Sequence, residues 1–109
     1  MKRYALTLDL KDDEKLISEY EAYHETIWPE IKQSIQSAGI LNMEIYRVAN
    51  RLFMIMEVGN DFSFEAKAKS DEANPKVQEW ETLMWKYQQA LPFAKPGEKW
   101  VLMDKIFAL

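Results

Sequence analysis

Two side chains that can exchange protons, Tyr20 and His24, lie four residues apart in the first quarter of the chain. On a helix this spacing places both on one face, and Ile27 and Trp28 follow just beyond them. Histidine is the side chain best suited to give or take a proton near neutral pH. The pair indicates a small polar site beside aromatic rings. The commoner alternative is a helical histidine that is exposed or hydrogen-bonded to backbone.

Tryptophan and glutamate side chains offer further candidates, each with a structural alternative. Trp80 shares a helical stripe with Val77 and Met84, so core packing is its first explanation and stacking against a ligand its second. Trp85 lies off this stripe, which indicates a subunit contact or a partly exposed ring. Glu57 interrupts an apolar strand pattern and needs a partner if it is buried.

The composition restricts the available chemistry. The 109 residues include no cysteine and one histidine, which excludes disulfides, thiolate sites and cysteine nucleophiles and argues against zinc. Fourteen basic and 18 acidic residues give a net charge of −4, which argues against a nucleic-acid partner. No glycine-rich phosphate loop or serine elbow is present. We therefore expect neither thiol nor zinc chemistry, and neither a phosphate cofactor nor nucleotide chemistry.

The same sequence predicts a cytoplasmic location. No segment approaches the roughly 20 apolar residues that span a bilayer. The basic start of the chain reaches Asp9 too early to leave room for the apolar run of a signal peptide. We expect neither a membrane nor a secretory pathway to be involved.

The elements that must position these residues follow from the hydrophobic pattern. Alternation of apolar and polar residues predicts four strands, at residues 3–10, 41–48, 52–58 and 100–109. Apolar residues at helical spacing, with cap residues before them, predict four helices, at residues 13–27, 29–38, 63–68 and 75–91. The second and third strands form a hairpin through Ala49-Asn50-Arg51.

This order of elements is typical of the ferredoxin-like α+β class, a four-stranded antiparallel sheet with helices on one face. At this length we expect a single domain over residues 1–109. Large apolar residues occur on both faces of the last three strands, so the uncovered face would expose an apolar patch. We expect a homodimer that packs sheet on sheet, the dimeric αβ-barrel arrangement.

The segment Tyr20–Glu30 resembles the L-rhamnose mutarotase family, with Tyr-x-x-x-His closely followed by Ile-Trp-Pro-Glu. The resemblance covers essentially the whole chain. Its further matches are Gly39, Ile45-Tyr46, Arg51–Met54 before Glu57, Gln78–Trp80 with Met84, and Ile106-Phe107.

The resemblance implies a cofactor-free homodimer that interconverts the α and β anomers of a 6-deoxy sugar by acid–base ring opening and closure. It makes His24 the proton donor, Tyr20 a sugar contact and Trp80 part of the pocket wall. It leaves the second proton-transfer group open among Tyr20, Tyr46 and Glu57.

Two substrate-binding positions depart from the family pattern. Met43 stands where the rhamnose enzymes have a sugar-contacting tyrosine, and Glu81 where they often have a second tryptophan. Losing a hydroxyl and an indole alters how sugar hydroxyls are bound. L-Rhamnose is the first expected substrate and L-fucose, another 6-deoxy sugar, the second.

Two other functions fit the same architecture, because one fold hosts many activities. One is a cofactor-free monooxygenase or dehydratase with an aromatic substrate. The other is a dimer that binds a small molecule without catalysis. The Tyr20–His24–Trp28-Pro29 combination favours the mutarotase.

Overall fold

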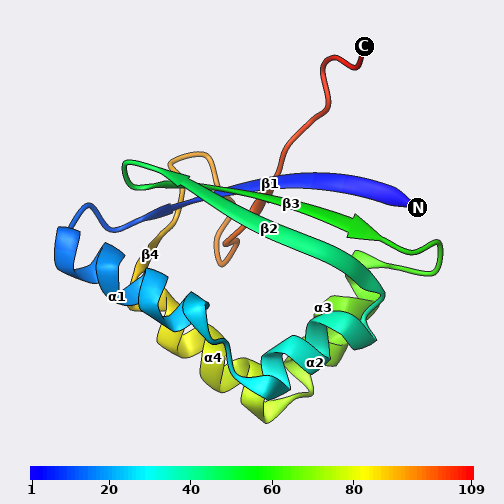
Figure 1. The fold of residues 1–109 in the computed structure, drawn as a ribbon, viewed down its shortest axis with the longest axis horizontal. Coiled ribbons are helices and arrows are strands. Elements are labelled where there is room, and N and C mark those ends of the chain that lie inside the picture. Colours follow the sequence, from blue (N-terminus) through cyan, green and yellow to red (C-terminus); the bar gives the residue numbers. More distant parts are fainter.

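Four helices cover one face of an antiparallel sheet in the computed structural model, which describes residues 1–109 (Figure 1). The strands are β1 (Lys2–Leu10), β2 (Ile40–Val48), β3 (Arg51–Val58), β4 (Gln88–Gln89) and β5 (Val101–Leu102). The helices are α1 (Glu14–Glu25), α2 (Pro29–Ser37), α3 (Phe64–Glu72) and α4 (Pro75–Trp85). The strand order is β2-β3-β1-β4, and β5 also pairs with β1. The predicted ferredoxin-like α+β class is confirmed.

Local sequence signals set where most of these elements begin. The Asp13 carboxylate accepts a hydrogen bond from the Leu16 backbone N–H at 3.0 Å and caps α1. Proline begins both α2 and α4, where its missing N–H costs no helical hydrogen bond. Gly39 adopts a φ of 93° just after α2, a conformation that glycine tolerates best. These boundaries agree with the predicted ones.

The core lies between the sheet and the helices. Leu6, Leu8 and Leu10 alternate along β1 and are buried beneath the helices, while the residues between them face the other side of the sheet. In the antiparallel register Leu6 lies opposite Met54 and Leu8 opposite Leu52 of β3. The predicted half-buried strand over residues 3–10 is confirmed, and the hairpin of β2 and β3 is confirmed with it.

The last predicted helix is shorter than expected. α4 ends at Trp85 rather than at Leu91. The chain then turns, and the Lys11 N–H donates to the Tyr87 carbonyl at 2.8 Å while Gln88 pairs with Leu10. The free edge of β1 gives these backbone groups partners, so Tyr87 and Leu91 become buried without being helical.

The predicted final strand over residues 100–109 is wrong beyond its first residues. Only Val101–Leu102 pairs with β1, followed by one hydrogen bond from the Met103 N–H to the Ala5 carbonyl at 2.8 Å. Extending this register would set Lys105 directly opposite Arg3, and like charges at paired positions destabilise a sheet. The tail leaves the sheet on the side away from the helices (Figure 1).

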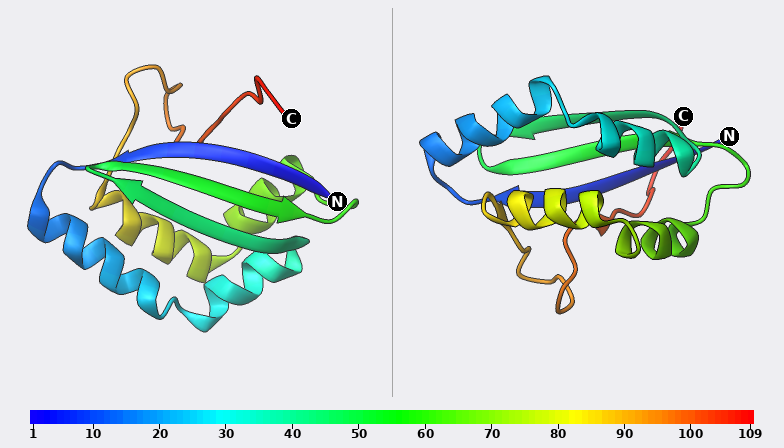
Figure 2. Two further views of the ribbon diagram at one scale, coloured as in Figure 1. Left: turned by 45° about the horizontal axis from the view of Figure 1, so that its top comes forward. Right: turned by 90° about the horizontal axis from the view of Figure 1, so that it is seen from below.

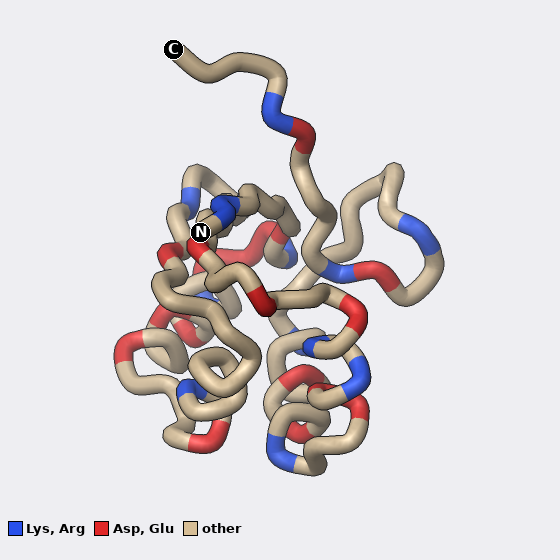
Figure 3. Tube along the Cα trace, turned by 90° about the vertical axis from the view of Figure 1, so that its right-hand side faces the viewer, with Lys and Arg blue, Asp and Glu red and all other residues tan.

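The helices form two rows over the sheet, α1 with α2 and α4 with α3 (Figure 2). Basic and acidic residues are interspersed along them (Figure 3). The opposite face of the sheet carries no helix (Figure 1). There the rings of Tyr46 and Phe53 lie 6.2 Å apart, and Tyr46 is 55% exposed. This open face is therefore partly apolar.

Candidate active site

A cavity of about 320 Å³ lies between the helices and the sheet, lined by residues of all four helices and of the three long strands. This volume is at the small end of the roughly 300–1,000 Å³ typical of ligand pockets. Fifteen of its 22 lining residues are hydrophobic, so the few polar groups among them are conspicuous. The structure brings all five residues predicted for the site into the lining, namely Tyr20, His24, Met43, Trp80 and Glu81.

His24 is held in one orientation at the end of α1. Its Nδ1 lies 2.8 Å from the Tyr20 backbone carbonyl, and since a carbonyl only accepts, Nδ1 carries the donated proton. Nε2 is then the ring nitrogen available to a ligand. Burial lowers the pKa of His24 below its ordinary value of 6.5, and the bond to the carbonyl offsets this only in part. The ring is therefore neutral at pH 7, with a lone pair on Nε2.

Tyr20 lies beside this imidazole, with the two rings 4.4 Å apart between centroids. Burial raises the pKa of its hydroxyl above 10, partly offset by the amide of Gln88, which donates to the hydroxyl at 3.5 Å. Tyr20 therefore stays protonated over the physiological range. The other side-chain atom of that amide, Gln88 Oε1, is buried and has no hydrogen-bond partner. An unpaired buried acceptor in a pocket wall suits a ligand that donates.

Aromatic rings close this end of the pocket. The Trp80 ring meets His24 at 5.6 Å and Trp28 at 5.1 Å, both edge to face. Tyr23 packs edge-on against Trp80 at 6.3 Å. Trp80 is buried in the larger core cluster, which confirms core packing, and it also lines the cavity, where stacking against a ligand stays a prediction.

The two positions that depart from the family pattern lie in different parts of the wall. Met43, on β2, packs against the core cluster that contains Met54 and Met56. Glu81, on α4, accepts from Gln78 Nε2 at 3.2 Å and lies 3.8 Å from Lys99 Nζ. Burial lowers the pKa of Lys99, and Glu81 partly opposes this change.

Two of the three candidates for a second proton-transfer group lie away from the pocket. Tyr46 is on the open face of the sheet, and Glu57 accepts there from Arg3 and Asn42 at 3.4 Å. Neither lines the cavity, whereas Tyr20 does.

Several polar lining residues were not predicted. Ser34, Lys67, Asp71, Gln88 and Lys99 all line the cavity. Lys67 and Asp71 are four apart on α3, a spacing that also occurs in ordinary solvent-exposed ion pairs. The sequence does not identify Gln88 as a pocket residue, because the pattern predicts a helix through its segment. No local signal in the sequence separates these residues from other polar surface residues.

Two structural features bear on other classes of function. No group of three or more His, Cys, Asp or Glu side chains lies close enough together to hold a metal ion. None of the four helices combines the length and the apolar character that crossing a membrane requires.

Together, the fold and the pocket define a ferredoxin-like α+β protein with a histidine–tyrosine pair in a small, mostly apolar cavity. Residues 3–109 match the sequence model of the L-rhamnose mutarotase family. An L-fucose mutarotase from Xanthomonas campestris pv. campestris is 49% identical over 111 residues, which cover 100% of this chain and 89% of that protein.

An L-rhamnose mutarotase from Shigella flexneri is 31% identical over 98 residues, covering 88% of this chain and 85% of that protein. The crystal structure of an L-rhamnose mutarotase from Formosa agariphila has the same fold, with a TM-score of 0.74 and 22% identity over 100% of this chain and 99% of that one. The chain belongs to the L-rhamnose mutarotase family and is a sugar mutarotase, an isomerase.

Proposed function

We propose that the protein interconverts the α and β anomers of L-fucose, with L-rhamnose as the second substrate, and that His24 and Tyr20 carry the proton transfers. The observation on which this depends most is the His24 ring, fixed through Nδ1, beside the Tyr20 ring in an apolar pocket. The greater identity to an L-fucose mutarotase, 49% against 31%, supports L-fucose as the first substrate.

Ring opening requires one proton to leave the anomeric hydroxyl and one to reach the ring oxygen. Nε2 of the neutral His24 accepts the first proton. The Tyr20 hydroxyl donates the second as the bond between C1 and the ring oxygen breaks, giving the open aldehyde. A weakly acidic phenol suffices here, because the departing ring oxygen becomes a stronger base than a phenolate.

Ring closure reverses both roles after the aldehyde has rotated about the C1–C2 bond. The protonated His24 donates to the former carbonyl oxygen, and the Tyr20 phenolate removes the proton from the attacking hydroxyl. Each residue thus returns to its starting state, and His24 is the proton donor of the closing step. Positioned acid–base groups of this kind contribute roughly 10²–10⁴-fold each.

The remaining wall suits a 6-deoxy sugar. Trp80 offers a flat apolar surface to the carbon skeleton, and Gln88 Oε1 offers an unused acceptor to a sugar hydroxyl. The role of Met43 and Glu81 in this proposal is to shape the wall where other family members carry a tyrosine and a tryptophan.

The proposal includes the expected homodimer and the cytoplasmic location. The open sheet face and the tail leave large apolar side chains uncovered, including Ile106 at 94% and Phe107 at 76% exposure. Covering such a patch with a second copy is the usual solution for an open sheet. Light scattering in solution is expected to give the mass of two chains, and the mass of one chain would contradict this part.

Saturation-transfer NMR between the α and β anomeric proton signals tests the activity directly. The protein should accelerate exchange for L-fucose, and to a smaller extent for L-rhamnose, over buffer containing heat-denatured protein. A larger effect on L-rhamnose would reverse the order of substrates. No acceleration with either sugar would refute the proposed function.

A further inference from the structure

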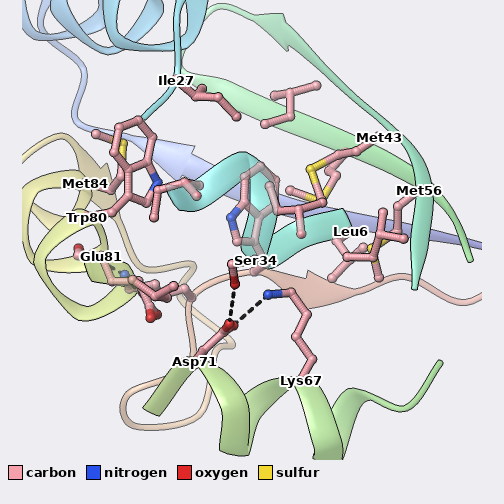
Figure 4. A pocket seen from close by; sticks show the side chains of 18 of the residues that line it. Leu6, Ile27, Ser34, Met43, Met56, Lys67, Asp71, Trp80, Glu81 and Met84 are labelled. Carbon is pink, nitrogen blue, oxygen red and sulfur yellow. Dashed lines mark hydrogen bonds and ion pairs between the residues drawn. The ribbon is translucent and has the colours of Figure 1, made fainter. Parts of the chain in front are cut away.

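Three polar side chains interrupt the apolar wall at the end of the pocket formed by α2 and α3. Ser34 Oγ, from α2, donates to Asp71 Oδ1 at 3.2 Å, and Lys67 Nζ donates to Asp71 Oδ2 at 2.7 Å (Figure 4). All three line the cavity. We name them the Ser34–Lys67–Asp71 cluster.

A second ion pair on the same helix shows that the placement of this cluster is specific. Lys69 and Glu65 have the same four-residue spacing on α3, but their side chains are 76% and 80% exposed. The Lys67 and Asp71 side chains are each 22% exposed, and they face the pocket with a bond from the neighbouring helix. Helical spacing alone therefore does not explain why a charged pair lies in an apolar wall.

The cluster has hydrogen-bonding capacity left over. Lys67 uses one of its three N–H donors here, and each carboxylate oxygen of Asp71 has a further lone pair. The Ser34 hydroxyl can still accept. Sugar hydroxyls donate and accept at once, so two hydroxyls on neighbouring carbons would use both the lysine and the carboxylate.

The position of the cluster in the fold selects which hydroxyls it can meet. Tyr20 and His24 come from α1, whereas Lys67 and Asp71 come from α3, which lies diagonally across the helical layer in the other row (Figures 1 and 2). In a pyranose ring, C4 lies directly across from C1, and C3 directly across from the ring oxygen. A sugar whose anomeric centre faces His24 therefore turns C3 and C4 toward the cluster.

We propose that the Ser34–Lys67–Asp71 cluster binds the hydroxyls on C3 and C4 and determines which 6-deoxy sugar the pocket accepts. This inference rests on the proposed function. L-Fucose carries these two hydroxyls in cis and L-rhamnose in trans, so a cluster that binds them as a pair distinguishes the two sugars. A site built to hydrogen-bond a hydroxyl strongly disfavours a ligand that lacks it.

Three variants of the cluster test the proposal, Ser34→Ala, Lys67→Met and Asp71→Asn. The matched controls on α3 are Lys69→Met and Glu65→Gln. Exchange NMR with L-fucose should show KM raised about tenfold or more for Lys67→Met and Asp71→Asn, less for Ser34→Ala, with kcat little changed. 4-Deoxy-L-fucose lacks the C4 hydroxyl that the cluster would bind. With this sugar, the difference in KM between wild type and the cluster variants should be smaller. The control variants should behave like wild type.

Two outcomes would overturn the inference. One is an unchanged KM in all three cluster variants, and the other is an equal rise in KM with L-fucose and with its 4-deoxy analogue. Binding of 1,5-anhydro-L-fucitol, which has no anomeric hydroxyl and cannot mutarotate, separates this test from the proposed function. The wild-type protein could fail to accelerate anomerisation and still bind this compound tightly, while the cluster variants bind it weakly. In that case the proposed function fails and the inference stands. Circular dichroism identifies any variant that does not fold, and the other two then decide.

Discussion

The two ends of the pocket differ in the charge of their polar side chains. At the α1 end, burial raises the pKa of Tyr20 and lowers the pKa of His24. Both shifts favour the uncharged side chain at neutral pH. At the α3 end, Lys67 and Asp71 form an ion pair that keeps partial access to water. The first arrangement gives groups that can change protonation state, while the second gives fixed donors and acceptors.

Under the proposed function, this difference would give the two ends separate tasks. Proton transfer needs groups whose protonated and deprotonated forms are both accessible during the reaction, and uncharged side chains in an apolar wall meet that need. Substrate selection needs groups whose charge stays constant, because their donors and acceptors must match one stereoisomer. Substitutions at the α1 end should therefore change kcat, and substitutions at the α3 end should change KM.

The largest expected effect comes from His24→Ala. Removing the proposed base should reduce the enzymatic exchange rate by roughly 10²–10⁴-fold, measured by saturation-transfer NMR on L-fucose. Glu25→Ala is the matched control, because Glu25 is the exposed next residue on α1 and lies outside the pocket. Full activity in His24→Ala would show that the histidine does not transfer the proton.

Tyr20→Phe should have the next largest effect. The change removes the proposed proton donor to the ring oxygen and keeps the aromatic ring, so kcat should fall about 10²-fold with a much smaller change in KM. Tyr23→Phe is the control, since Tyr23 is on the same helix but does not line the cavity. A rise in KM at constant kcat would instead make Tyr20 a binding residue only.

The pH dependence should follow the lowered pKa of His24. Catalysis needs the neutral ring, so kcat/KM should be constant at neutral pH and fall on acidification through a pKa below 6.5. The raised pKa of Tyr20 removes any alkaline decline below pH 10. Because His24 is the only histidine, its ring-proton NMR signal should titrate with the same midpoint. A midpoint above 6.5 in either measurement would contradict the base role.

Folding stability should also depend on the protonation of His24, and it should decrease on acidification because the folded protein buries the neutral ring. The unfolded chain binds a proton at His24 near pH 6.5, at a higher pH than the folded chain does. The free energy of unfolding should therefore be constant above about pH 6.5 as far as this group is concerned, and should fall between pH 6.5 and the folded pKa. In His24→Asn, denaturant unfolding should lack this contribution.

Much of the scaffold, and the placement of Tyr20 beside His24 in the pocket wall, could be predicted because their signals are local. Asp13 caps α1, Pro29 begins α2, and the four-residue spacing puts Tyr20 and His24 side by side. Such signals depend on residues within one or two turns of each other. They can therefore be recognised in the sequence without knowledge of the tertiary contacts.

The α3 end of the pocket and the C-terminal part could not be predicted for the opposite reason. Asp71 enters the pocket wall only because α3 lies against Ser34, 37 residues away in the sequence. Gln88 leaves the predicted helix because the edge of β1 is free to pair with it. The last strand ends after Leu102, and its continued register would set Lys105 opposite Arg3, a residue of another strand.

The smallest expected effect separates selection from stability at the α3 end. Ion pairs four residues apart on a helix contribute only about 0.3–0.5 kcal/mol, so Lys67→Met should change the free energy of unfolding by about that amount. Lys69→Met, at the exposed pair on the same helix, should change it no more. A loss of several kcal/mol in Lys67→Met alone would make the ion pair a structural support for α3, and its effect on KM would then follow from a displaced helix rather than from lost sugar contacts.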